Sequence, residues 1–304
     1  MADSNVFDRR AVGLHRERAA ASFATHDYLF ADAARRLADR LDDVKRPFAR
    51  ALALGARGGI AALLRRRGIA RVIACDLSPA FAAAHRDGPS LAADEEFLPF
   101  GAGAFDLVVS TLSLHWVNDL PGALIQIRRA LAPDGLFLAA MLGGDTLVEL
   151  RRAFLEAEAA EEGGASPRTS PFADVADAGM LLQRAGFALP VVDSDTITVT
   201  FADAFALMRD LRRMGESGAA HARRKNFTRR ATIFAMAERY RALFGGADGR
   251  IPATFQIVTL TGWAPHEAQP KPLRPGAART RLADALGADE TPAGDKADPS
   301  PRTR

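Results

Sequence analysis

Residues 106–137 read DLVVSTLSLHWVNDLPGALIQIRRALAPDGLF, and this stretch decides the fold. It opens with an apolar run at 107–109, which a polar turn follows. Residues 120–131 carry apolar side chains at helical spacing, and a Pro-Asp-Gly turn then precedes a second apolar run at 136–142. The order strand, helix, strand predicts one βαβ unit, and such a unit implies a parallel sheet.

Strand and helix patterns of the same kind occur before and after this βαβ unit in the sequence. The sequence predicts strands at 51–54, 71–75, 90–93, 197–201 and 253–263, and helices at 10–41, 60–67, 146–162 and 205–244. A chain of 304 residues is long enough for one large domain with additions. Because strands and helices alternate, the expected fold class is α/β.

Composition excludes several classes of protein. With 40 basic and 37 acidic residues, the net charge of +3 is too small to indicate a nucleic-acid partner. The single cysteine, Cys75, excludes an internal disulfide, and the scattered histidines predict no metal site. No apolar run approaches the roughly 18–20 residues of a membrane span, and residues 1–10 lack the apolar core of a secretory signal. We therefore expect a cytoplasmic protein without an integral membrane segment, with peripheral membrane association left open.

Glycine and acidic residues follow three of the predicted strands. Gly55-Ala56-Arg57-Gly58-Gly59 follows the first strand, Asp76 ends the second, and Asp94-Glu95 follows the third. Glycines let a backbone approach a ligand closely, and a strand-end acid can bind ribose hydroxyls. Because the carboxyl ends of parallel strands meet at one edge of a sheet, this ordered series predicts a site for an adenosine-type ligand.

These residues carry a family resemblance. Over residues 50–145 the chain resembles class I S-adenosylmethionine-dependent methyltransferases, on Leu54 to Gly59, Asp76, Asp94 to Phe100 and the stretch 106–137. The resemblance implies a Rossmann-like fold with a seven-stranded, mostly parallel sheet and helices on both faces. It also implies an N-terminal helical lid at 1–46, a methyltransferase-like domain at 47–263, and a helical insertion at 203–245 before the last strand. The Pro-rich tail at 264–304 is expected to be disordered.

The same resemblance implies S-adenosylmethionine as the cofactor. It assigns the cofactor site to Arg18, Gly55, Ala56, Arg57, Gly59, Asp76, Leu77, Asp94, Glu95, Ser110 and Leu112. Two positions depart from the family pattern, because Ala53 stands where an acid is usual and Arg57 where a second glycine is usual. The alternative is therefore a loop in which cofactor binding is weakened or lost.

Longer segments narrow the resemblance to a subgroup. LHWVNDLPGALIQIRRALAPDGLF is similar to the biotin-pathway malonyl-carrier-protein methyltransferases. Four further segments resemble bacterial relatives of the respiratory complex I assembly factor of this fold, which is understood to hydroxylate an arginine. These segments are VFDRRAVGLHRERAA, MLGGDTLVELRRAF, LMRDLRRMGES and IPATFQIVTLTGW. This implies a protein substrate, such as a complex I subunit. A non-catalytic assembly chaperone and a small-molecule or acyl-carrier methyltransferase are the alternatives.

Candidate catalytic residues lie in the turn of the opening stretch. His115 can act as a base at neutral pH, or it can support Trp116 as a hydrogen-bonded loop residue. Asp119 can take part in the chemistry, or it can cap the helix that follows, which is the commoner role for Asp before a helix. Two basic segments, 209–214 and 223–230, are candidates for receiving a protein partner, although a solvated helix face is the usual role of such runs.

Overall fold

The computed structural model describes residues 5–170, 175–270, 284 and 287. The chain divides into a unit of residues 1–266 and a second unit of residues 267–304, and the fold below belongs to the first. The expectation of disorder at 264–304 falls largely on residues outside the described part of the chain.

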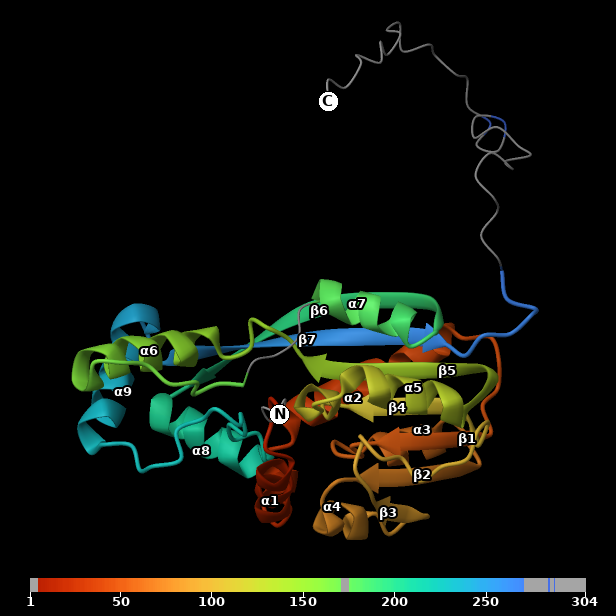
Figure 1. The fold of residues 1–304 in the computed structure, drawn as a ribbon, viewed down its shortest axis with the longest axis horizontal. Helices are drawn as coiled ribbons and strands as arrows, with labels where there is room; N and C mark the ends of the chain where they lie inside the picture. Colours follow the sequence, from red (N-terminus) through yellow and green to blue (C-terminus); the bar gives the residue numbers. More distant parts are fainter. Residues whose placement is uncertain (1–4, 171–174, 271–283, 285–286, 288–304) are drawn as a thin grey trace, which may run out of the picture. The chain divides into compact units, whose positions relative to one another are not determined.

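In the described part of the chain, seven strands form one sheet in the order β3-β2-β1-β4-β5-β7-β6 (Figure 1). Neighbouring strands from β3 to β5 pair in parallel, whereas β7 runs antiparallel to both β5 and β6. The expected seven-stranded, mostly parallel sheet is therefore confirmed. The strands are β1 (Arg50–Leu54), β2 (Arg71–Asp76), β3 (Ser90–Ala92), β4 (Phe105–Thr111), β5 (Leu131–Leu142), β6 (Ala188–Phe201) and β7 (Ile251–Trp263).

Helices cover both faces of this sheet. They are α1 (Arg9–Ala19), α2 (Tyr28–Asp39), α3 (Ile60–Arg66), α4 (Pro79–Ala84), α5 (Leu120–Ala130), α6 (Val148–Glu162), α7 (Val175–Arg184), α8 (Ala204–Met214) and α9 (Arg230–Phe244), with short 3-10 turns at Phe23–Thr25, Arg40–Asp43 and Leu114–Trp116. Successive side chains of β1 point to opposite faces. Ala51 and Ala53 therefore join a core with α2 and α3, and Leu52 and Leu54 join another with α5 and α7.

The βαβ unit read from residues 106–137 is present as β4, α5 and β5. Ser110 lies opposite Ala139 in the parallel register of β4 and β5. Asp119 caps α5, because its Oδ1 accepts a hydrogen bond of 2.8 Å from the backbone N–H of Gly122. Leu124 and Ile127 are fully buried on the inner face of the helix.

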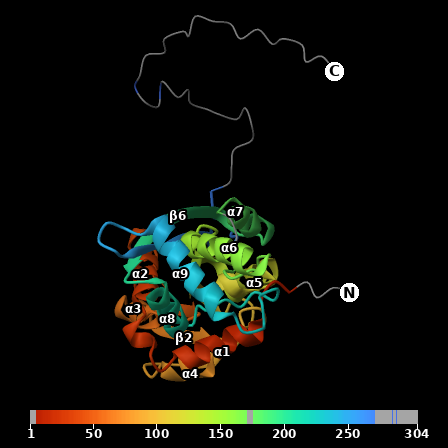
Figure 2. The ribbon, with the colours of Figure 1, turned by 90° about the vertical axis from the view of Figure 1, so that its left-hand side faces the viewer.

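Several helices lie at the carboxyl ends of the parallel strands. Figures 1 and 2 show α1, α8, α9 and α6 at this end, with α1 below α8. The long helix expected at 10–41 is in fact α1 and α2, because the segment between them breaks at Phe23–Thr25, where the hydroxyl of Thr25 donates to the carbonyl of Ser22 at 2.9 Å. The break lets α1 cross the strand ends while α2 packs on the sheet.

Two further elements differ from the expectation. The helical stretch expected at 205–244 is divided into α8 and α9, because Gly215 adopts a φ of +82° and ends α8. The strand expected at 197–201 begins earlier, at Ala188, and pairs with β7 along most of its length. Among the described residues, no helix is long and apolar enough to cross a membrane.

Candidate functional site

The carboxyl ends of β1, β2 and β4 meet at one point of the sheet edge. Leu54 lies opposite Cys75 of β2 and opposite Ser110 of β4. The residues that follow these positions, Gly55 and Asp76, therefore lie side by side, as the sequence predicts. Asp76 is fully buried, and its Oδ1 accepts a hydrogen bond of 2.8 Å from the backbone N–H of Ser78.

The glycines of the loop after β1 bring other segments of the chain close. A Cβ on Gly55, whose φ is +60°, would lie 2.3 Å from Cβ of Ser113. A Cβ on Gly58, whose φ is +66°, would lie 2.4 Å from the backbone of Phe30 in α2. The space beside these two glycines is therefore filled by the chain itself. Gly59 differs, because nothing lies within 4 Å of a Cβ placed there.

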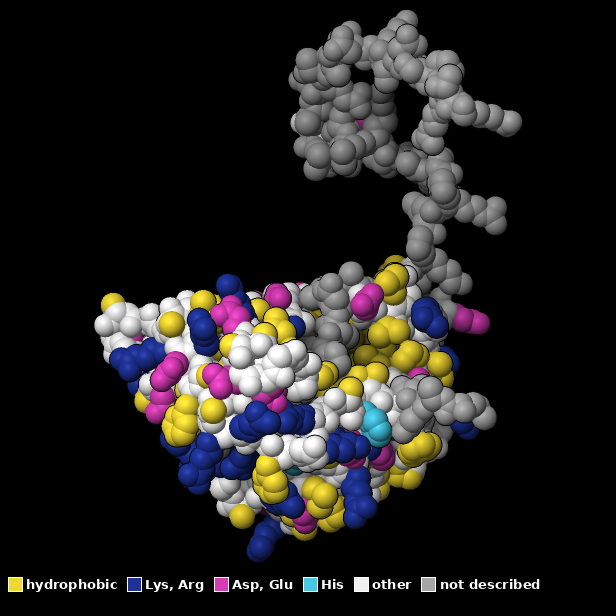
Figure 3. Space-filling view, turned by 60° about the vertical axis from the view of Figure 1, so that its left-hand side comes forward, with side chains coloured by type: hydrophobic (Ala, Val, Ile, Leu, Met, Phe, Trp, Pro, Cys, Tyr) yellow, Lys and Arg dark blue, Asp and Glu magenta, His cyan; other side chains and the backbone are white. Residues whose placement is uncertain are grey.

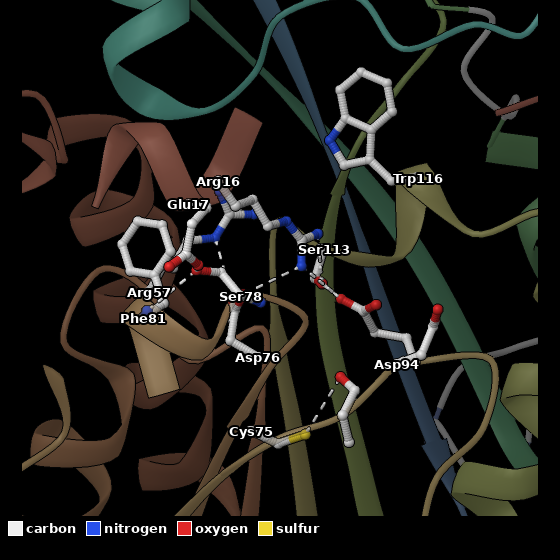
Figure 4. Close-up of polar contacts among 12 residues, drawn as sticks. Arg16, Glu17, Arg57, Cys75, Asp76, Ser78, Phe81, Asp94, Ser113 and Trp116 are labelled. Atoms are coloured by element: carbon white, nitrogen blue, oxygen red, sulfur yellow. Dashed lines mark hydrogen bonds and ion pairs between the residues drawn. The ribbon is translucent and has the colours of Figure 1, made fainter. Parts of the chain in front are cut away.

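Arg16 of α1 reaches into the strand ends (Figure 4). Its Nη1 lies 2.8 Å from Oε1 of Glu95 and 3.5 Å from Oδ1 of Asp76, and its Nη2 donates to Oγ of Ser113 at 3.1 Å. Arg16, Asp76 and Glu95 are each fully buried. Burial opposes the charged form of Arg16, but the carboxylates of Glu95 and Asp76 outweigh it and raise the pKa of Arg16.

The acidic pair after β3 ties α1 to the sheet. Arg9, seven residues before Arg16 on the same helix, pairs with both Asp94 and Glu95. Burial alone would raise the pKa of Glu95, but the guanidinium groups of Arg16 and Arg9 outweigh it and hold that pKa well below its ordinary value. Asp94 and Glu95, both predicted as cofactor ligands, are thus engaged by α1.

Arg57 occupies the centre of the site. Its Nη1 lies 3.0 Å from Oε1 of Glu216, its Nη2 donates to the carbonyl of Leu112 at 2.8 Å, and its Nε lies 3.7 Å from Oδ2 of Asp76. The guanidinium carbon lies 4.3 Å from the centre of the Phe30 ring, which is cation–π distance. Burial and the nearby charge of Arg16 lower the pKa of Arg57.

Glu216, just after α8, connects this cluster to the turn after β4. Its Oε2 accepts hydrogen bonds from Nε1 of Trp116 at 2.8 Å and from Nε2 of His115 at 3.0 Å. Burial would raise the pKa of Glu216, but His115 and Arg57 outweigh it and lower the pKa to about 2. Burial also lowers the pKa of His115.

The hydrogen bonds of His115 bear on its role. Its Nδ1 accepts from the backbone N–H of Leu142 at 3.4 Å, so the neutral ring carries its proton on Nε2, which donates to Glu216. Both ring nitrogens are engaged in this arrangement. The contacts favour the supporting role that the sequence left open, in which His115 holds Glu216 and Trp116 in place.

A cavity of about 220 Å³ opens beside Glu216. Its walls are mostly apolar, and the polar residues that line it are Arg168, Thr169, Ser170, Arg212, Glu216 and Ser217. The remaining residues that line it are Leu29, Trp116, Leu142, Leu147, Leu150, Phe154, Met208, Leu211, Met214, Gly218 and Phe255. Asp76, Glu95 and Arg57 do not line it, whereas Glu216 and Trp116 do, so the cavity adjoins the strand-end cluster at Glu216.

The other predicted site residues take different places. Ala56 is buried beside β2, where its N–H donates to the carbonyl of Cys75 at 3.1 Å. Leu77 packs against an apolar cluster that contains Val12 and Trp116. Arg18 is exposed on α1, and Asp119 is exposed at the cap of α5, so neither joins Asp76 or His115 in the buried cluster.

No pattern used above pointed to four further residues of the cluster, Arg9, Arg16, Ser113 and Glu216. A local signal for Arg16 exists, because it precedes Arg18 on the helix that was expected to be a lid. Glu216 lies in the segment LMRDLRRMGES, but its sequence separation from His115 and Arg57 hides their contact. In the described part of the chain, no group of three His, Cys, Asp or Glu residues is placed to hold a metal ion.

Comparisons with known proteins place the chain in a family. A methyltransferase-domain model matches residues 52–139. The mitochondrial arginine-hydroxylase NDUFAF5 of Danio rerio is 44% identical over 287 residues, which cover 92% of this chain and 89% of the relative. The chain belongs to the methyltransferase-domain family that contains this protein. The YcgJ protein from Bacillus subtilis, 14% identical over 76% of this chain and 99% of its own, shares the fold with a TM-score of 0.51.

This family also contains acyl-carrier enzymes. The malonyl-acyl-carrier-protein O-methyltransferase of Halorhodospira halophila is 36% identical over 270 residues, which cover 86% of this chain and 90% of the relative. The resemblance to both subgroups is therefore confirmed. The expected cytoplasmic location is wrong on this comparison, because the NDUFAF5 relative at 44% identity is named as a mitochondrial protein.

The cofactor of such methyltransferases, S-adenosylmethionine, does not fit the strand ends as they are arranged here. Arg16 and Arg57 flank the carboxylate of Asp76, and Ser113 fills the space beside Gly55. The arrangement nevertheless leaves Oδ2 of Asp76, Oγ of Ser110 and Nε of Arg57 buried without a hydrogen-bond partner among the described residues. Each such group costs about 1–3 kcal/mol, so this packing is not the optimum for its own polar atoms.

Proposed function

We propose that the chain is an enzyme of the methyltransferase-domain family that methylates an arginine side chain of a protein connected with the assembly of respiratory complex I, and that S-adenosylmethionine could serve as its cofactor only once Arg16 and Arg57 move away from Asp76. The name of the Danio rerio relative, an arginine-hydroxylase, supports arginine as the target. The resemblance of segments along the chain to a complex I assembly factor supports the protein partner. Hydroxylation of the same side chain, as in the name of the relative, is an alternative outcome of the test below.

The observation that carries this proposal is the carboxylate of Glu216 beside an apolar cavity of about 220 Å³. An arginine side chain has an apolar stem and a cationic end, and the guanidinium pairs strongly with carboxylates. Leu147, Phe154 and Met208 would contact the stem, and Glu216, whose Oε1 also pairs with Arg57, would share its carboxylate with the guanidinium. In this arrangement His115 and Trp116 hold the Glu216 carboxylate in place.

The insertion between β6 and β7 is the surface that we assign to the protein partner. Figure 3 shows Lys and Arg side chains spread over the face that contains α8 and α9. Arg223 and Arg224 are tied by ion pairs to Asp8 and Glu162, whereas Lys225 is exposed. The exposed basic residues suit an acidic or polar protein surface.

The alternative is an assembly chaperone that performs no chemistry. Its support is the closed arrangement of Asp76, which Arg16 and Arg57 contact. A chaperone needs the partner surface but not the cavity beside Glu216.

Affinity capture with mass spectrometry separates these functions. Tagged wild-type chain is used to capture partners, with Glu216→Gln as the site variant and Glu161→Gln, an exposed change on α6, as the matched control. We expect a complex I subunit whose arginine is heavier by one methylene group with the wild type and Glu161→Gln, but not with Glu216→Gln.

The other outcomes are equally specific. A gain of one oxygen atom on that arginine indicates hydroxylation. Capture of the same subunit with no change in mass supports the chaperone. Capture of an acyl-carrier protein contradicts the complex I proposal and supports the relationship to the malonyl-acyl-carrier-protein enzymes.

A further inference from the structure

A second cavity lies beside the cavity of about 220 Å³ that is proposed to receive the substrate arginine. Its own volume is about 170 Å³, and Arg168, Arg223 and Arg224 are among its lining residues. No acidic residue of the described part of the chain lines it. Because Arg168, Thr169 and Gly218 line both cavities, the two are neighbours. The second cavity is called the arginine pocket below.

Two arginines of this pocket are held by acidic residues that do not line it. Nη2 of Arg223 lies 2.8 Å from Oδ2 of Asp8, and Nη1 of Arg224 pairs with Oε2 of Glu162. Arg223 also donates to the carbonyl of Ala220 at 3.0 Å. A guanidinium has five N–H donors, so these bonds fix both side chains and leave donors for a ligand.

Positive charge exceeds negative charge on the segment that carries these arginines. Residues 217–237 include five Lys or Arg and no Asp or Glu. A hydrogen bond from Arg223 lowers the pKa of Asp8, and the charge of the exposed Lys225 lowers that pKa further. The acid that holds Arg223 therefore faces more than one cation, and an added anion would be attracted to the pocket.

Arg168 lies between the two cavities. Its Nε donates to Oε1 of Glu158 at 2.6 Å, and its Nη1 donates to Oγ1 of Thr228 at 2.8 Å. The guanidinium carbon lies 5.3 Å from the centre of the Phe154 ring, which lines the larger cavity. Because the buried Glu158 offsets the charge of Arg168, a substrate guanidinium can enter the larger cavity beside it.

We propose that the arginine pocket binds a carboxylate of the substrate protein that lies one or two residues from the target arginine. The inference rests on the proposed function, since it takes the neighbouring cavity as the site of that arginine. Residues two apart in an extended peptide point to the same side and lie about 7 Å apart, so their side chains can enter neighbouring cavities. The planar fork of an arginine pairs well with carboxylates. The substrate class is therefore an arginine with Asp or Glu close to it in sequence.

Calorimetry with two peptides tests this inference. The acidic peptide is acetyl-Gly-Asp-Asp-Arg-Asp-Asp-Gly-amide, and the neutral peptide has Asn in place of each Asp. The site variant is Arg224→Gln, and the matched control Arg66→Gln removes the same charge from an exposed position of α3. We expect wild type and Arg66→Gln to bind the acidic peptide about tenfold more tightly than the neutral one, which corresponds to about 1.4 kcal/mol. Arg224→Gln should lose most of this preference.

Two results overturn the inference. One is equal binding of the two peptides by wild type. The other is a preference for the acidic peptide that Arg224→Gln keeps in full, because that preference would come from charge elsewhere. If Arg224→Gln does not fold, Arg223→Gln takes its place with the same expectation.

Inorganic phosphate distinguishes a free anion from a substrate carboxylate. Phosphate that raises the melting temperature of wild type but not of Arg224→Gln, together with equal binding of the two peptides by wild type, would assign the pocket to a free anion. That result contradicts the inference. A preference for the acidic peptide that Arg224→Gln loses supports the substrate carboxylate.

The neutral peptide separates this inference from the proposed function. If Glu216→Gln binds it more weakly than wild type but wild type does not prefer the acidic peptide, the inference fails and the proposed arginine cavity stands. If Glu216→Gln binds it as tightly as wild type, the proposed arginine cavity fails. A preference for the acidic peptide that depends on Arg224 would then still support carboxylate binding in the arginine pocket.

Discussion

Arg16 and Glu95, both fully buried, are joined by a 2.8 Å contact between Nη1 of the arginine and Oε1 of the glutamate. This pair fastens α1 across the carboxyl ends of the strands, because Arg16 belongs to α1 and Glu95 follows β3. The position of the N-terminal helix therefore depends on a buried charge pair as well as on apolar packing.

Removal of Arg16 should lower the free energy of unfolding by a large amount. Arg16→Ala leaves Glu95 and Asp76 buried without this partner, and loss of one member of a buried pair costs about 3–5 kcal/mol. Urea unfolding measures the change, with the exposed Arg18→Ala as control, for which we expect a change within about 0.5 kcal/mol. Equal losses of unfolding free energy in the two variants would show that the buried pair does not hold α1 in place.

Gly55 and Gly59 form a matched pair of substitutions in one loop. Both have positive φ, of +60° and +78°, so Gly55→Ala and Gly59→Ala share a left-handed backbone cost of about 1–2 kcal/mol. Only at Gly55 does the new Cβ meet Ser113, at 2.3 Å, so Gly55→Ala should be the more destabilising. Thermal unfolding compares them, and a larger loss at Gly59 would contradict the described packing of the loop.

Stability should fall in acid through Glu216. Its pKa is about 2 in the folded chain against an ordinary 4.5, so the unfolded chain binds more protons between these values. Stability from this group is therefore complete above pH 4.5 and is lost as pH falls toward 2, at up to about 1.4 kcal/mol per pH unit. Denaturant unfolding against pH should give a shallower acid limb for Glu216→Gln than for wild type. The exposed Glu161→Gln should follow the wild-type curve, and parallel limbs for all three would contradict the assignment.

Asp119 should affect stability and not chemistry. Asp119→Ala removes the 2.8 Å bond to Gly122, and loss of such a cap costs about 1 kcal/mol. Asp119→Asn keeps an oxygen acceptor, so it should lose less stability than Asp119→Ala. Substrate modification by both variants should match wild type below their melting temperatures; a large loss of activity in folded Asp119→Asn would instead indicate a catalytic carboxylate.

The sheet could be predicted because its signals are local. The unit β4-α5-β5 rests on apolar runs, helical spacing and the cap at Asp119, each of which lies within a few residues in sequence. The first half of β6 escaped prediction because residues 188–196 lack a strong apolar alternation, and its pairing with β7 is long-range. The break between α1 and α2 was not predicted because apolar side chains continue at helical spacing across it.

The site could be predicted only where strand ends define it. Asp76 ends β2, and Gly55 and Asp94 follow the neighbouring parallel strands β1 and β3, so their proximity follows from topology. Arg16 belongs to α1 and Glu216 follows α8, and no local sequence pattern states where these helices lie on the sheet edge. Arg57 was recognised as a departure from the family pattern, but its contacts with Glu216 and Phe30 required the folded chain.

We propose that this chain modifies an arginine of a complex I protein at the cavity beside Glu216. The most direct measurement is the mass of that arginine in complex I subunits from cells that lack the chain, complemented with wild type, Glu216→Gln or Glu161→Gln. We predict modified arginine with wild type and Glu161→Gln, and unmodified arginine without the chain or with Glu216→Gln. Modification that persists in cells without the chain would contradict the claim.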